Sequence, residues 1–294
     1  MKRSIVGVVI VLTFVAVGIA AAPPLTFTFF DVHTIKTATE TDSYGVNNAG
    51  VIVGDYIDAK SIQHAFILAG TKLTTVNNKA CSNLTLAFYA VNTAGTAVGW
   101  CTNVATGLNE GFTYASGKFT PVNFPKSSGT QATGINDKGW VSGAYLDSSN
   151  VQHAFVKKGN KYTSIDVKGD TSADAYGINN AGDMTVYAFN SSSDYVSYLY
   201  NGKTFTKISD PKASVLGTVV HVPNNKGDIT GTYFVNSSGS EASGFLLHNG
   251  KYYDVMDPKA NNSTRSDGLN DKLEMVGRYT PSTGGNVGFK ATTK

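Results

Sequence analysis

The sequence lacks the short motifs by which the common enzyme classes are recognised. It contains no GxSxG elbow, HExxH helix, Walker loop, dinucleotide-binding fingerprint or CxxC pair. Asp55, Asp58 and Asp147 occur in polar loops, but their spacing does not reproduce a calcium-binding loop. We therefore expect no metal and no cofactor, and these absences favour a non-catalytic protein over an enzyme.

Charge is also scarce. Charged residues make up 15% of the chain, and the formal net charge is +3. Loss of Lys2 and Arg3 with a signal peptide lowers this charge to +1. Such a weak field does not favour nucleic acid or anionic lipid, so we expect neither as a partner.

Long apolar runs are missing except at the N-terminus, which reads MKRSIVGVVIVLTFVAVGIAAAPP. Two basic residues, an apolar stretch and closing small residues predict a secretory signal peptide over residues 1–22. A retained membrane anchor is the alternative, because the apolar run is about the length that can span a bilayer. We expect residues 23–294 to form one domain that is secreted or periplasmic, without a membrane span.

Helical spacing of apolar residues is rare, and short apolar runs alternate with Gly, Ser, Thr and Asn. This pattern predicts an all-β protein with tight turns. One phrase, as in YGVNNAG, recurs along the whole chain at intervals of 45, 44, 43, 45 and 46 residues. Its asparagines are Asn47, Asn92, Asn136, Asn179, Asn224 and Asn270. A period near 45 indicates an array of similar supersecondary units.

Each unit is predicted to contain four strands. The first ends at the repeated phrase, whose Asn and Gly suit a tight turn closed by a left-handed glycine. Leu273 occupies the glycine position of the sixth unit, which leaves a different hairpin open there. The second strand carries a V-x-G-x-Y-like pattern, the third an HAF-like pattern, and a fourth, as in YTSIDV (162–167), closes the unit.

Four antiparallel strands per repeat describe a β-propeller blade. The sixth repeat stops after three strands, and FTFFDV (27–32) matches YTSIDV in pattern. We predict a six-bladed β-propeller of four-stranded antiparallel blades, closed by the N-terminal strand completing the last blade. Closure removes both open sheet edges. A monomer is expected.

The recurring His-Ala-Phe, G-[IV]-N-x-x-G and [FY]-T-x-[IV]-D motifs resemble the bacterial extracellular repeat family named after its His-Ala-Phe (HAF) motif. The resemblance covers about residues 27–290. It implies export and a propeller-like repeat but no general biochemical activity. The full motif survives only at 64–66 and 153–155, where His64 and His153 are interpreted as organising a loop or, alternatively, as binding residues.

Departures from the repeat are the better candidates for a site. The residue three before each repeat asparagine is expected near the mouth of the central channel, and these residues are Tyr44, Tyr89, Thr133, Tyr176, His221 and Asp267. His221 and Asp267 fall on adjacent blades and are the catalytic candidates, because an imidazole beside a carboxylate suits acid–base chemistry. A structural ion pair and sequence drift are the alternatives. Tyr44, Tyr89, Tyr176, Glu241 and Arg265 are the predicted binding residues.

Cysteine is limited to Cys81 and Cys101. Cys101 replaces the tyrosine of a second strand, and Cys81 lies in the connection that enters the same blade. Export provides an oxidising environment, so we predict a disulfide between them, with two free thiols as the alternative.

Three functions remain open. The leading one is a secreted, non-catalytic binding module of the cell exterior that recognises a glycan or a surface protein. The second is a glycan hydrolase or lyase acting at the channel mouth, and the third is an inert envelope component. A deep charged pocket between the fifth and sixth blades would favour the enzyme, and a flat tyrosine-rich face would favour binding. The fold itself serves all three.

Overall fold

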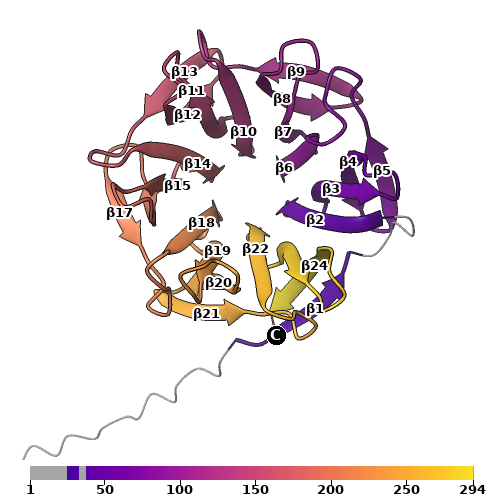
Figure 1. Ribbon diagram of the computed structural model, residues 1–294, viewed down its shortest axis with the longest axis vertical. Helices are drawn as coiled ribbons and strands as arrows, with labels where there is room; N and C mark the ends of the chain where they lie inside the picture. Colours follow the sequence, from indigo (N-terminus) through magenta and orange to yellow (C-terminus); the bar gives the residue numbers. More distant parts are fainter. Residues whose placement is uncertain (1–24, 33–37, 294) are drawn as a thin grey trace, which may run out of the picture.

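Each of the six sequence repeats forms one four-stranded antiparallel blade. The computed structural model describes residues 25–32 and 38–293, and these residues contain strands and turns but no helix. The blades surround a central axis, and the first strand of each repeat lies nearest to it (Figure 1). The expected signal peptide lies outside the described residues.

Blades 1 to 3 follow one another along the chain. From the axis outwards their strands are β2 (Ala38–Val46), β3 (Ile52–Asp58), β4 (Gln63–Ala69) and β5 (Lys72–Val76); β6 (Ala87–Val91), β7 (Ala97–Thr102), β8 (Asn109–Ala115) and β9 (Lys118–Val122); and β10 (Gly129–Ile135), β11 (Val141–Leu146), β12 (Gln152–Lys158) and β13 (Lys161–Ile165).

Blades 4 to 6 continue the ring. Their strands are β14 (Ser172–Ile178), β15 (Met184–Phe189), β16 (Tyr195–Tyr200) and β17 (Phe205–Ile208); β18 (Thr218–Pro223), β19 (Ile229–Phe234), β20 (Ala242–His248) and β21 (Lys251–Val255); and β22 (Ser263–Leu269), β23 (Met275–Thr280), β24 (Val287–Thr293) and β1 (Phe27–Asp31). A single parallel bridge, Ala242 to Ser263, links blades 5 and 6.

The N-terminal strand closes the ring, which confirms the prediction. Strand β1 pairs antiparallel with β24, and Figure 1 shows the two ends of the coloured chain side by side in the sixth blade. This pairing covers the edge that a three-stranded last blade would leave exposed.

The register of that strand differs from the match between FTFFDV and YTSIDV. Asp31 lies opposite Phe289, and the equivalent Phe155 lies opposite Ser164. Asp31 therefore takes the place of Ser164 and not that of Asp166. A shift of two residues keeps every side chain on its own face of the strand, so the alternating pattern cannot detect it.

The repeat asparagines join the blades as well as shaping the turns. All six are buried, and each side-chain Nδ2 donates to the main-chain oxygen of the next asparagine around the axis. The six distances lie between 2.9 and 3.3 Å, and the last bond runs from Asn270 back to Asn47. We call this closed circle the asparagine ring. The asparagine ring explains why asparagine recurs at this position in every repeat better than turn chemistry alone does.

The turn that follows each asparagine has the predicted left-handed residue. Gly50 has φ 78°, and its N–H donates to the Asn47 oxygen over 2.9 Å. Leu273 adopts φ 58° and donates to the Asn270 oxygen over 3.2 Å. The sixth hairpin is therefore built like the others, and Leu273 holds a backbone conformation that costs roughly 1–2 kcal/mol for a residue with a side chain.

Small residues line the inner strands because the blades converge. A Cβ atom on Gly45 would lie 2.8 Å from the Tyr89 oxygen and 2.9 Å from the Ala90 Cα of the next blade. The absence of a side chain at this position is thus what allows two inner strands to pack directly against each other.

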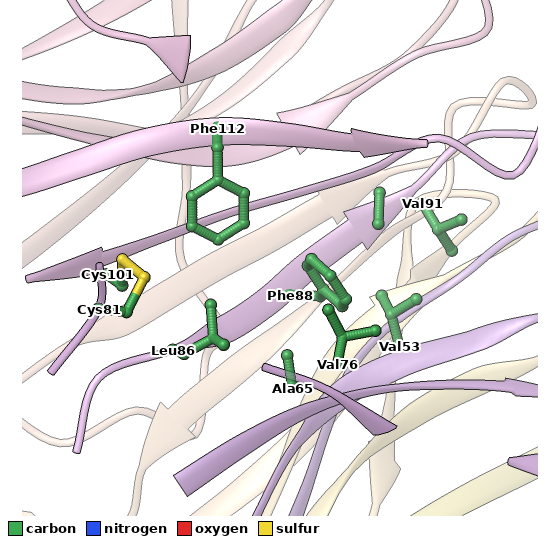
Figure 2. Close-up of a cluster of buried hydrophobic side chains, with 10 residues drawn as sticks. Val53, Ala65, Val76, Cys81, Leu86, Phe88, Val91, Cys101 and Phe112 are labelled. Carbon is green, nitrogen blue, oxygen red and sulfur yellow. A yellow bond between two sulfur atoms is a disulfide. The ribbon is translucent and has the colours of Figure 1, made fainter. Parts of the chain in front are cut away.

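Apolar clusters fill the space between neighbouring blades. Between blades 1 and 2, Val53 and Val76 pack with Phe88 and Phe112 (Figure 2). The disulfide between Cys81 and Cys101 lies at the edge of this cluster, with a Cα–Cα distance of 5.6 Å. The predicted pairing is therefore present in the structure, and both cysteines are buried.

Candidate functional site

The channel mouth is built from a β-bulge that recurs at an equivalent position in each innermost strand, and β2 has a second irregularity near its start, between Ala38 and Glu40. The register shifts at the same place in all six blades, for example between Ser43 and Gly45 in β2. A bulge changes the direction in which a side chain points. The residues at the shifts are the predicted register: Tyr44, Tyr89, Thr133, Tyr176, His221 and Asp267. We call these six residues the bulge ring.

Five members of the bulge ring contact one another in sequence order. Tyr44 and Tyr89 stack with their centroids 4.8 Å apart, and Tyr89 meets Tyr176 edge-on at 6.3 Å. Tyr176 packs against His221 at 4.7 Å. His221 Nδ1 lies 3.3 Å from Asp267 Oδ1, so the structure brings the two catalytic candidates together.

His221 and Asp267 belong to a buried polar network. His221 Nδ1 is 2.9 Å from the Ser266 oxygen, and Arg278 Nη1 donates to Asp267 Oδ2 over 3.0 Å. Burial lowers the pKa of His221, and the Asp267 carboxylate opposes that change in part. We therefore assign a neutral imidazole that donates from Nδ1. A neutral imidazole beside a carboxylate can accept a proton, which is the chemistry that the sequence suggested.

Three further carboxyls surround the mouth. Asp42 and Asp55 lie directly opposite each other on β2 and β3, and Asp174 lies opposite Tyr187 on β14 and β15. Burial raises the pKa of all three, that of Asp174 to about 6. Ionisable groups are thus more concentrated here than the composition of the whole chain indicates.

A cavity of about 170 Å³ opens off the axis between blades 4, 5 and 6. It exists because blade 5 carries the small Val219 and Thr232 where blade 6 carries Arg265 and Arg278 at equivalent positions. We call it the mouth cavity. Its lining residues are Tyr176, Tyr187, Tyr195, Val219, His221, Thr232, Phe234, Arg265, Asp267 and Arg278.

The predicted binding residues divide into three groups. Tyr176 and Arg265 line the mouth cavity. Tyr44 and Tyr89 belong to the bulge ring but lie outside that cavity. Glu241 is an exposed loop residue just before β20 and does not line it.

The site also contains residues that the sequence reasoning missed, chiefly Arg278, Thr232 and Tyr187. The first two directly precede the second-strand tyrosines Tyr279 and Tyr233. These site residues could have been found from the sequence, because the residue before that tyrosine varies between repeats and faces the channel mouth from the second strand. The resulting cavity is both charged and tyrosine-lined, so it combines the two features that were expected to separate an enzyme from a binding module.

The HAF-motif histidines lie away from the mouth and join loops. His153 contacts Asp147 through Nε2 over 3.4 Å and Asp166 through Nδ1 over 2.5 Å. His64 makes the equivalent contacts with Asp58 over 3.1 Å and Asn77 over 2.6 Å. These bonds are those expected of residues that organise each loop. Within residues 25–32 and 38–293, no group of three or more potential ligands is placed to hold a metal ion.

No protein-family model and no curated protein matches this sequence. Solved structures do match. A fungal lectin from Aleuria aurantia, described as having a six-bladed β-propeller fold and a novel fucose recognition mode, has a TM-score of 0.54 at 12% identity, covering 87% of this chain and 93% of the lectin. An N224Q mutant of that lectin with Fucα1-6GlcNAc gives 0.56 at 11% identity, covering 88% and 96%.

A sialidase from Trypanosoma rangeli gives a TM-score of 0.55 at 11% identity, covering 92% of this chain and 60% of the sialidase. At such identities the similarity establishes the fold alone. The protein is a six-bladed β-propeller, and its resemblance to the HAF repeat family stays a prediction. No helix of the described segments has the length and apolar character needed to cross a membrane.

Proposed function

We propose that this protein is a secreted, non-catalytic module of the cell exterior that binds a glycan in the mouth cavity. The observation that carries the proposal is the lining of that cavity, where tyrosine and phenylalanine rings stand beside a few polar groups. Aromatic walls with a small number of placed hydrogen-bonding groups are typical of small-ligand sites. The propeller lectins share the fold, and the bond between Cys81 and Cys101 is consistent with an oxidising compartment.

A glycan array probed with the mature protein tests the proposal. Binding to a defined group of glycans is expected, and Tyr195→Ala should abolish most of it because this ring forms part of the cavity wall. Tyr200→Ala is the matched control, since Tyr200 lies on the same strand outside the cavity. Absence of glycan binding, or equal binding by both variants and the parent, would reject the proposal. Absence of all glycan binding would leave two alternatives, recognition of a surface protein or an inert envelope component.

Secretion has its own test. Protein recovered from the medium or periplasm of an expressing culture should begin at residue 23 when its N-terminus is sequenced. Retention of residues 1–22 in a membrane fraction would instead support the anchor.

A glycan hydrolase or lyase is the second candidate, and the contact between His221 and Asp267 favours it. Glycans that bind on the array should be incubated with the protein and analysed for cleavage. We expect no turnover. Cleavage that disappears in His221→Ala would overturn this expectation and assign the imidazole a catalytic role.

A further inference from the structure

The starting observation is a pair of like charges on adjacent strands. Arg265 on β22 lies directly opposite Arg278 on β23. Like charges that face each other across two strands destabilise a sheet. Arg278 is compensated, because it bonds Asp267 over 3.0 Å and lies 3.8 Å from Asp42.

Arg265 is not compensated in the same way. Its guanidinium lies 5.8 Å from the centre of the Phe234 ring, and no carboxylate among the described residues is within ion-pairing distance of it. The side chain is only partly exposed and lines the mouth cavity. One positive charge therefore faces this cavity without an anionic partner from the described chain.

A second, independent observation points to a ligand at the same place. The Thr232 hydroxyl is buried, with the residue only 2% exposed, and its Oγ1 has no hydrogen-bond partner among the described residues. Thr232 also lines the mouth cavity. A buried hydroxyl without a partner is costly, and a bound acceptor would satisfy it.

The walls and the size limit what can enter. Tyr195 stacks on Phe234 at 5.5 Å and meets Tyr187 edge-on at 5.9 Å, which gives an apolar face on one side. The volume of about 170 Å³ is below the roughly 300–1,000 Å³ typical of sites for drug-sized ligands. The cavity thus limits its occupant to about the size of a single sugar residue or a part of one.

We infer that the mouth cavity binds the carboxylate of an acidic sugar residue, with Arg265 as its ionic partner and the Thr232 hydroxyl as a second donor. This inference rests on the proposed glycan-binding function and names its ligand class. A planar carboxylate matches the fork of a guanidinium. Phosphate is disfavoured, because its second negative charge would lie close to Asp267 on the cavity wall.

The test uses matched ligands. Oligosaccharides that end in a uronic acid or a sialic acid are compared with the same oligosaccharides after the carboxyl group has been reduced to an alcohol. A third set consists of oligosaccharides without a carboxyl group that carry a sulfate instead. We expect the parent protein to bind at least one carboxylate form with about tenfold or higher affinity than the reduced form. A hydrogen bond to a charged group contributes enough free energy for a difference of this size. The preference should weaken as salt is added, since part of the attraction is screened.

Variants identify the residues. Arg265→Gln should remove the preference for the carboxylate, whereas Lys272→Gln, on an exposed turn of the same blade at the other end, should keep it. Thr232→Val should weaken binding of the carboxylate form while leaving the thermal stability equal to or above that of the parent, because it removes an unpartnered buried hydroxyl.

The outcomes separate the two proposals. Equal affinity for carboxylate and reduced forms, with Tyr195→Ala still abolishing binding, overturns the acidic ligand and keeps the glycan-binding function. Preference for the sulfated sugars overturns the carboxylate assignment. An unchanged preference in Arg265→Gln overturns the role of that residue, and failure of every glycan to bind overturns both proposals.

Discussion

The side chain of Asn270, in the last repeat, donates a hydrogen bond of 2.9 Å to the main-chain oxygen of Asn47, in the first. The two residues are 223 positions apart in the chain and adjacent in the ring. This bond closes the asparagine ring at the same junction where β1 closes the sixth blade. The propeller is therefore joined twice at its seam, once by side chains near the axis and once by a strand pair at the rim.

The two roles of the repeat asparagine can be separated at Asn136. Its Oδ1 accepts bonds from the N–H groups of Lys138 and Trp140 within the turn, and its Nδ2 donates to Asn179 in the next blade. Asn136→Asp keeps the acceptor and loses the donor. We expect a loss of at least about 1–3 kcal/mol in the free energy of unfolding, because a buried carbonyl loses its donor and a buried carboxylate then faces that oxygen.

Asn201→Asp is the matched control for that measurement by urea denaturation. Asn201 is exposed, and the aspartate that replaces it would still accept the hydrogen bonds from the N–H groups of Lys203 and Thr204. We expect a change within about 0.5 kcal/mol. Equal losses at the two positions would mean that the ring bonds contribute nothing beyond the turn.

Much of the architecture could be predicted because it repeats. Six copies of one phrase fixed the blade count, and the short last repeat required a strand from the other end. Comparing the copies also located the bulge ring, since Tyr44, His221 and Asp267 share one register. The register of β1 could not be predicted, because a two-residue shift leaves every side chain on the same face of the strand.

The mouth cavity could be predicted only in part. Its inner side, with Tyr176 and His221, comes from the first strands, whose phrase is easy to align. Thr232 and Arg278 come from second strands and meet these residues only across blades. The cavity itself forms because small residues lie beside larger ones from neighbouring blades. This difference in size can be seen only when the blades are placed side by side in three dimensions.

Leu273 offers a gain in stability. It adopts φ 58°, where five other blades have glycine, and its side chain is partly buried. Leu273→Gly should raise the free energy of unfolding by up to about 1 kcal/mol, since relief of the left-handed backbone outweighs the loss of partial packing.

Gly139→Leu is the reverse substitution in another blade. A Cβ at this position meets nothing within 4 Å, so only the backbone conformation should affect stability. Thermal denaturation should show opposite shifts; a decrease in both variants would contradict the argument.

The disulfide should contribute substantially to stability. Cys81 and Cys101 are 20 positions apart, and a loop of that size is worth roughly 3 kcal/mol when it is closed without strain. Intact-mass analysis should show a gain of one hydrogen per sulfur on reduction. The Cys81→Ser and Cys101→Ser double variant should unfold at lower denaturant concentration than the oxidised parent, and at the same concentration as a parent kept reduced throughout. A double variant as stable as the oxidised parent would show that the bond is absent or without effect.

Asp174 should make the protein more stable in mild acid than at neutral pH. Burial raises the pKa of its carboxyl to about 6, and the hydrogen bond from Tyr187 offsets this only in part. The unfolded chain has a value near 3.9, so between about pH 4 and pH 6 the native state binds more protons than the unfolded state. Stability therefore increases as the pH falls through about 6, and the increase is complete only below about pH 4, the pKa of the unfolded chain. Asp174→Asn removes this contribution, which is roughly 2–3 kcal/mol. Urea midpoints measured at about pH 7 and pH 5 should show the variant more stable than the parent at the higher pH. The difference in stability between variant and parent should be smaller at the lower pH.

Two other buried carboxyls, Asp42 and Asp55, also have raised pKa values and leave some pH dependence in the variant. Parallel pH profiles for parent and variant would show that Asp174 is not the titrating group.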